Sequence, residues 1–239
     1  MKRWGIRKAV GLALALAAAG CGDYPRDARG TLERVRAGAR PLRVGWTLAE
    51  PWVGAGNGEG GPAGVEPDLV RDWAKSIGVQ IEWVSGSEAQ LVRALQRNTI
   101  DVAVAGFADS GPWGARIGQT QPYLEAAAVI GAAPGPAAPR DWKGVEVRYD
   151  RRRPDLAAAL RGIGAVPVPA DAGGMAPFAV AYEPELAALG LAPAGKALAT
   201  ERRVVATAPA ENALTLALDR FLQPRRDEIG RRLAAESRR

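Results

Sequence analysis

The chain of 239 residues has no histidine and a single cysteine, Cys21. A disulfide within the chain is therefore excluded. Catalytic arrangements that pair a serine or cysteine nucleophile with histidine are excluded as well, together with the usual zinc sites built from histidine and cysteine. Much hydrolytic chemistry is thereby ruled out, and we expect the protein to use no metal and no other cofactor.

Little net positive charge remains beyond the first residues. The net charge is +6, but Lys2, Arg3, Arg7 and Lys8 supply four positive charges before the first acid, Asp23. The rest of the chain is only weakly basic, and it has neither a nucleic-acid-binding motif nor a basic stripe studded with aromatic residues. We therefore expect no nucleic acid as a partner.

The N-terminus has the layout of a secretory signal. A basic start is followed by an apolar run over residues 9–19 and by small residues directly before Cys21. The run is too short to span a membrane. Residues 18–21, Ala-Ala-Gly-Cys, resemble the lipobox of bacterial lipoproteins, in which the cysteine is lipidated and becomes the new N-terminus. The alternative is cleavage at an Ala-x-Ala site that leaves a free thiol; we favour lipidation of Cys21, which otherwise has no evident use.

Residues 98–124 carry the most informative pattern. An apolar run over residues 100–107 is long enough for one buried strand, and it leads into a turn-rich segment with Ser110 and Arg116. In an open α/β sheet, ligands bind at the carboxyl ends of parallel strands, where unpaired backbone N–H groups meet. The planar fork of Arg116 can grip a carboxylate. The pattern predicts a ligand site at the end of this strand.

This order of features resembles the amino-acid-type solute-binding proteins, family 3, of bacteria. In that family a helix ending in Leu-x-x-Gly-x-Ile-Asp precedes a buried strand, a loop of small residues, a ligand-gripping arginine and a Pro-Tyr pair. The corresponding residues here are Leu95, Asn98, Ile100, Asp101, Gly106, Phe107, Ala108, Ser110, Arg116, Pro122 and Tyr123. The resemblance implies an α/β fold of the type II periplasmic-binding-protein class, with two α/β lobes joined by a two-strand hinge.

The beginning of the first lobe extends the resemblance. Residues 42–46 predict a first strand, and in the family the loop that follows ends in proline and an aromatic residue that packs on the ligand. Trp46 and Trp52 are the corresponding candidates, and Glu50 lies in the same loop. Glu88 stands where the family commonly has a stacking aromatic residue. Its carboxylate either faces a cationic part of the ligand or simply favours a helix N-terminus.

The second lobe departs further from the family pattern. Residues 142–148 resemble its first strand, but Asp150 and the arginines at residues 151–153 replace the Gly-Thr or Gly-Ser that binds ligand in the family. These arginines could hold an acidic ligand directly or form a solvated run. The helix that the family has between the strands predicted at residues 165–168 and 178–182 is missing or vestigial.

Four parts are therefore expected along the chain. A signal peptide covers residues 1–20, and a polar, arginine-rich, lipid-anchored tether covers residues 21–40. Lobe one comprises residues 41–131 plus 208–239, and a shortened lobe two comprises residues 132–207.

The resemblance implies a monomeric lipoprotein, anchored in a membrane and facing the periplasm or the outer cell surface. It would bind a small carboxylate-bearing, amino-acid-like molecule and present it to an ABC permease, without enzymatic activity. The ligand-binding candidates are Trp46, Glu50, Trp52, Glu88, Gly106, Phe107, Ala108, Ser110 and Arg116. One alternative is a degenerate sensor or adaptor on the same fold. The other is an enzyme resembling the cyclohexadienyl dehydratases, with Glu50 or Glu88 as the acid.

Overall fold

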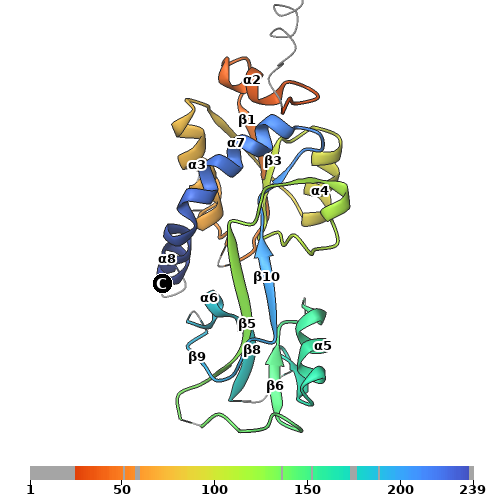
Figure 1. Ribbon diagram of the computed structural model, residues 1–239, viewed down its shortest axis with the longest axis vertical. Helices are drawn as coiled ribbons and strands as arrows, with labels where there is room; N and C mark the ends of the chain where they lie inside the picture. Colours follow the sequence, from red (N-terminus) through yellow and green to blue (C-terminus); the bar gives the residue numbers. More distant parts are fainter. Residues whose placement is uncertain are drawn as a thin grey trace, which may run out of the picture.

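Two β-sheets lie one after the other along the long axis of the molecule (Figure 1). The structure is a computed structural model, and it describes residues 25–50, 52–56, 60–135, 137–151, 153–172, 177–187 and 189–236. Helices flank both sheets, and two long strands run from one to the other. The predicted two-lobed α/β architecture is confirmed. The predicted signal peptide and Cys21 lie outside the described residues.

The sheet of lobe one has five strands, three of them parallel. β1 pairs in parallel with β2 and with β3, whereas β11 pairs antiparallel with β3 and β4. The order across the sheet is β2 (Ile81–Ser85), β1 (Leu42–Trp46), β3 (Val102–Val104), β11 (Ala206–Thr207) and β4 (Gly118–Gln119). The helices of this lobe are α3 (Val65–Ser76), α4 (Glu88–Gln96), α7 (Asn212–Leu222) and α8 (Arg226–Glu236). The carboxyl ends of the three parallel strands face lobe two (Figure 1).

Local sequence explains why α4 starts and packs where it does. The Ser87 side chain accepts a hydrogen bond from the Gln90 backbone, and the Gln90 side chain accepts one from the Ser87 backbone, which together form a capping box. Leu91 and Leu95 are buried beneath the helix. On β1, a side chain at Gly45 would meet Ile100 at 2.5 Å and Leu91 at 2.8 Å. The absence of a side chain at Gly45 therefore lets α4 lie close on the sheet.

The sheet of lobe two contains both long strands. Its order is β10 (Ala199–Arg203), β5 (Leu124–Ala132), β8 (Phe178–Tyr182), β6 (Glu146–Tyr149) and β7 (Val166–Pro169), with β9 (Ala192–Pro193) paired to β5. The helices are α5 (Pro154–Gly162) and the single turn α6 (Glu183–Leu186). As expected, the described part of the connection from β7 to β8 contains no helix. This lobe is correspondingly small.

The crossings between the lobes differ from the predicted boundaries. β5 pairs with β10 from Leu124 opposite Arg203 to Ala128 opposite Ala199, and both strands belong to the sheet of lobe two. Lobe two therefore begins at Leu124 rather than at residue 132, and the chain is back in the lobe-one sheet at β11. An apolar run shows that a strand is buried, but it does not show which sheet the strand joins.

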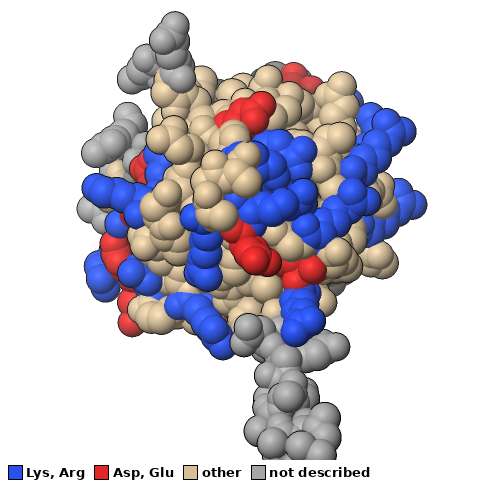
Figure 2. Space-filling model, turned by 90° about the horizontal axis from the view of Figure 1, so that it is seen from above, with Lys and Arg blue, Asp and Glu red and all other residues tan. Residues whose placement is uncertain are grey.

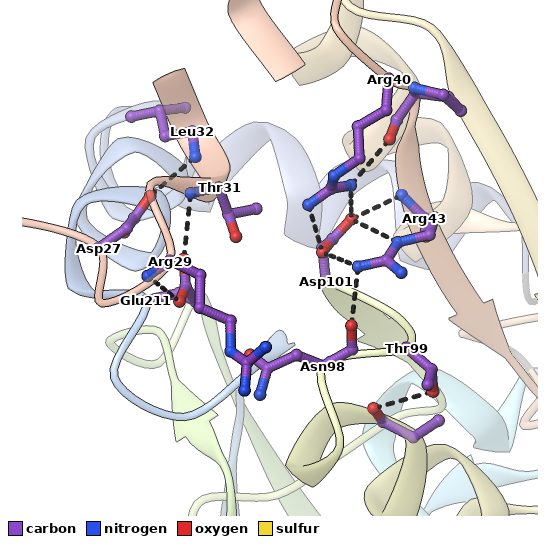
Figure 3. A network of polar contacts seen from close by, with 12 residues as sticks. Asp27, Arg29, Thr31, Leu32, Arg40, Arg43, Asn98, Thr99, Asp101 and Glu211 are labelled. Atoms are coloured by element: carbon purple, nitrogen blue, oxygen red, sulfur yellow. Dashed lines mark hydrogen bonds and ion pairs between the residues drawn. The ribbon is translucent and has the colours of Figure 1, made fainter. Parts of the chain in front are cut away.

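The N-terminal segment also differs from the expected tether. The helix α2 (Thr31–Arg36) is docked on lobe one, with Thr31 and Val35 buried. Asp27 accepts hydrogen bonds from the backbone N–H group of Leu32 at 2.7 Å (Figure 3) and from that of Leu214 at 2.9 Å. Among the described residues, no helix is long and apolar enough to cross a membrane. Residues 25–40 are thus part of the folded body, held by partners that are distant in the sequence.

Candidate functional site

The edge of lobe one that faces lobe two carries the predicted site residues. Because β1, β2 and β3 are parallel, the loops that follow them meet at this edge. Trp46 ends β1 and is half-buried, and Glu88 is the exposed first residue of α4. Glu50, Ser110 and Arg116 are also exposed. The structure thus brings these loops to one edge.

Trp113 links two of the predicted residues. Its indole N–H donates a hydrogen bond to the Glu88 carboxylate, which joins the loop after β3 to the start of α4. The Arg116 guanidinium lies over the Trp113 ring, 5.7 Å from its centroid. Sequence reasoning did not select Trp113. The sequence signal that could have identified it is an aromatic residue in a turn-rich loop that follows a buried strand.

The loop at Gly106, Phe107 and Ala108 makes hydrogen bonds within the protein. The Gly106 N–H donates to Glu66 at 3.0 Å, and the Phe107 carbonyl accepts from the Val204 N–H at 2.9 Å. Ala108 forms an isolated antiparallel bridge with Arg203, and the Phe107 side chain is buried. The loop therefore holds the return strand of the hinge, and ligand contacts by these three residues stay a prediction.

Arg203 fills the space between the lobes at the hinge. Its side chain is 4% exposed, and its guanidinium lies 4.7 Å from the ring centroid of Trp52 and 5.0 Å from that of Tyr182. It also donates to the Gly106 carbonyl and lies 2.8 Å from a Glu201 carboxylate oxygen. Such stacking of a cation on two aromatic faces is favourable, and more so where water is excluded. Trp52, predicted to line the ligand site, packs on Arg203 and is itself buried.

A second arginine completes this hinge cluster from lobe two. Arg153, next to the start of α5, lies 4.5 Å from the Tyr182 ring centroid and donates to the Tyr182 hydroxyl at 2.5 Å. It also forms an ion pair with Glu201 at 2.5 Å. Burial, with the hydrogen bond to Glu201, raises the pKa of Tyr182 well above its usual value. Arg153 thus points into the structure, whereas Arg151 pairs with Asp171 at the surface.

Glu66, in the first turn of α3, connects this helix to the hinge. Its carboxyl group is buried and accepts hydrogen bonds from the Tyr123 hydroxyl at 2.5 Å and from the Gly106 N–H. Burial raises the pKa of the Glu66 carboxyl, and burial together with the Glu66 charge raises the pKa of Tyr123. Sequence reasoning missed Glu66, whose only signal was its place between Val65 and Pro67 in the first helical turn.

The two groups of residues differ in what they can do. In the hinge cluster of Trp52, Arg153, Tyr182, Glu201 and Arg203, the charged groups pair with one another and stack on the aromatic rings, although Glu201 Oε2 and the Nε and Nη2 of Arg203 are buried without a hydrogen-bond partner. The open edge instead offers an aromatic ring with a carboxylate at its N–H and a guanidinium over its face. The described residues contain no group of three or more acidic, cysteine or histidine side chains that could hold a metal ion. The open edge is therefore suited to binding a small polar molecule that carries charge.

The sequence and the fold both match known proteins. Residues 42–227 match the family described as bacterial extracellular solute-binding proteins, family 3. A search of curated proteins found no match.

Several solved structures are similar. An ancestral amino acid-binding protein, a precursor of cyclohexadienyl dehydratase, is 21% identical with a TM-score of 0.64, over 87% of this chain and 100% of that one. A putative ABC-transporter binding component from Wolinella succinogenes, complexed with lysine, is 19% identical with a TM-score of 0.65. The match covers 80% of this chain and 94% of that one. A Streptococcus pneumoniae amino acid ABC transporter substrate-binding protein, bound to L-arginine, is 16% identical with a TM-score of 0.62, over 86% and 97%. The predicted type II fold is confirmed.

Proposed function

Because the chain belongs to the bacterial extracellular solute-binding proteins of family 3, we propose that it captures a small amino-acid-like ligand outside the cytoplasm and delivers it to an ABC transporter. The protein does so without breaking a bond in the ligand. It acts as a monomer, held at the membrane by a lipid on Cys21. The observation that carries the proposal is the charged aromatic edge of lobe one, formed by Glu88, Trp113 and Arg116.

The arrangement at this edge fits a zwitterion. Arg116 lies over the face of the Trp113 ring, and Glu88 lies at the N–H edge of the same ring. A cation and an anion separated by one aromatic ring can pair the carboxylate and the ammonium group of one amino acid. Trp46, half-buried at the end of β1, adds apolar surface to the same edge. The ligand class is therefore a small molecule with both charges.

Closure of the lobes follows from how they are joined. β5 and β10 pair side by side as they leave lobe one, so the second sheet can rotate about these two strands. A ligand on the lobe-one edge would then be covered by lobe two, and the permease would recognise the closed form. The similar structures bound to lysine and to L-arginine are consistent with a ligand of this class.

A thermal-shift screen tests the proposal. The chain from residue 22 is heated with amino acids, opines, dicarboxylates and small peptides. A ligand at about one hundred times its dissociation constant stabilises the folded state by roughly 2.7 kcal/mol. Arg116→Gln should abolish the shift, whereas Arg161→Gln, an exposed arginine in the last turn of α5, should leave it unchanged. The proposal would be contradicted by a folded protein whose unfolding temperature no compound raises. It would also be contradicted if both variants lost the ligand-induced shift equally.

The hinge cluster favours a second candidate, a sensor or adaptor that no longer closes on a ligand. Arg203 already joins Trp52 of lobe one to Tyr182 of lobe two. A folded protein that binds no small molecule but retains a membrane protein partner would support this candidate. A dehydratase is the weakest candidate, because Glu50 and Glu88 are exposed and the buried Glu66 is enclosed by Tyr123. Turnover of a prephenate-type substrate would instead support the dehydratase.

A further inference from the structure

The end of lobe one opposite lobe two is strongly cationic. The strands β1, β2 and β3 begin at this end, the helices α3 and α4 end there, and α2 covers it (Figure 1). Its exposed cations include Arg29, Arg34, Arg36, Lys75 and Arg97. Within the described ranges, none of these five side chains forms an ion pair. Figure 2 looks onto this end and shows arginine and lysine side chains spread over much of it.

Of the acids at this end, Glu33 on α2 is exposed, whereas three others are bonded within the fold. Asp101 is buried and pairs with Arg40 at 2.6 Å and with Arg43 at 2.8 Å (Figure 3). Asp27 and Glu211 accept hydrogen bonds from backbone N–H groups at and near the start of α2. Five exposed cations that form no ion pair among the described residues thus stand against one exposed acid of α2, Glu33. The outer charge of this end is therefore positive, although the chain as a whole is only weakly basic.

A lipid anchor on Cys21, as proposed above, would bring this end to the membrane. Cys21 precedes Pro25, the first described residue, by four positions, which span at most about 14 Å when fully extended. From residue 27 onward the segment is bonded to lobe one through Asp27 and Glu211. A lipid on Cys21 would therefore leave the cationic end within a short distance of the lipid headgroups.

We propose that the cationic end of lobe one, with Arg34 and Arg36 of α2 at its centre, binds anionic lipid headgroups. Opposite charges attract across such a surface, and the attraction falls off over roughly 8 Å at physiological salt, so it acts when the surface lies close to the headgroups. Contact at this end orients the molecule so that lobe two points away from the bilayer. The anchoring argument rests on the proposed lipidation of Cys21, whereas the charge of the surface does not.

Vesicle binding tests the proposal without the lipid anchor. The chain lacking residues 1–20, with Cys21→Ser, is sedimented with phosphatidylcholine vesicles that do or do not contain phosphatidylglycerol. We expect binding only to the anionic vesicles, and its loss as salt is raised. Each cation near an anionic surface strengthens binding by about fivefold, so Arg34→Gln with Arg36→Gln should weaken it by roughly twenty-five-fold.

The matched control removes the same charge from lobe two. Arg140 and Arg161 are exposed there, and Arg140→Gln with Arg161→Gln should bind anionic vesicles as the parent does. Unfolding curves establish that both double variants fold. The proposal would be overturned if the two double variants lost equal amounts of vesicle binding. It would also be overturned if the parent bound neutral vesicles, or if it did not bind anionic vesicles at low salt. Because no ligand or lipidation is involved, none of these outcomes depends on the proposed transport function.

Discussion

The guanidinium of Arg203 stacks on the indole of Trp52, with 4.7 Å between Cζ and the ring centroid, and so ties the last residue of β10 to the first loop of lobe one. The same guanidinium faces Tyr182, the last residue of β8. A single side chain therefore contacts both lobes beside the two strands that connect them. The angle between the lobes depends on this contact as well as on the backbone of β5 and β10.

Replacement of Arg203 should weaken the folded state. Arg203→Ala removes both aromatic contacts and the ion pair with Glu201, which keeps Arg153 and Tyr182 as partners. We expect a loss of about 2–4 kcal/mol in the free energy of unfolding, measured by urea denaturation. The neighbouring Arg202 pairs with Asp109 but is 57% exposed, so Arg202→Ala should cost less than about 1 kcal/mol. Similar losses in the two variants would show that Arg203 does not brace the hinge.

Glu66 should make stability depend on pH. Because burial raises its pKa above the usual 4.5, the folded protein keeps a proton that the unfolded chain has released. The stability of the parent protein should therefore fall as the pH rises from about 4.5 through the raised pKa. Glu66→Gln should flatten the profile in this window, and Glu125→Gln, an exposed carboxyl on β5, should not. If stability varied with pH in the same way in the parent and in Glu66→Gln, Glu66 would not be the source of the pH dependence.

Asp101 should make the stability of the fold depend on pH in the opposite direction. Burial opposes its charge, but hydrogen bonds from Arg43 and Arg40 prevail and lower its pKa below 3.8. Its contribution is present above about pH 4 and is lost as the pH falls through the lowered pKa. Asp101→Asn should cost roughly 3 kcal/mol near neutral pH and lose less stability on acidification than the parent. The control is Asp171→Asn, whose pair with Arg151 is exposed; a matching loss there would refute the buried-pair explanation.

Local patterns in the sequence were sufficient for the architecture but not for the hinge. The apolar run over residues 100–107 predicted the buried strand β3, and the family pattern implied a helix ending near Leu95, where α4 ends. Arg203 and Glu66 could not be assigned in this way, because their partners lie far away along the chain. The bond from Leu214 to Asp27 joins residues 187 positions apart, which is why the docked α2 segment was mistaken for a tether.

Gly106 provides a steric test of the same hinge. Its backbone has φ of +62°, and a Cβ there would lie 2.9 Å from Cδ1 of Trp52. Gly190 shares the left-handed conformation, with φ of +66°, but a Cβ at that residue would have no other atom within 4 Å. Gly190→Ala therefore isolates the backbone cost of about 1–2 kcal/mol, whereas Gly106→Ala should add about 1–3 kcal/mol from the clash.

Displacement of Trp52 by that clash should also disturb its stacking with Arg203. The Gly106→Ala protein should then show a changed tryptophan emission spectrum, which Gly190→Ala should leave as in the parent. Because Arg203 holds Trp52 on one side and Tyr182 on the other, the disturbance should reach lobe two. Equal unfolding free energies and unchanged emission in both variants would mean that Trp52 can move aside freely, and that the contact between Trp52 and Arg203 does not set the angle between the lobes.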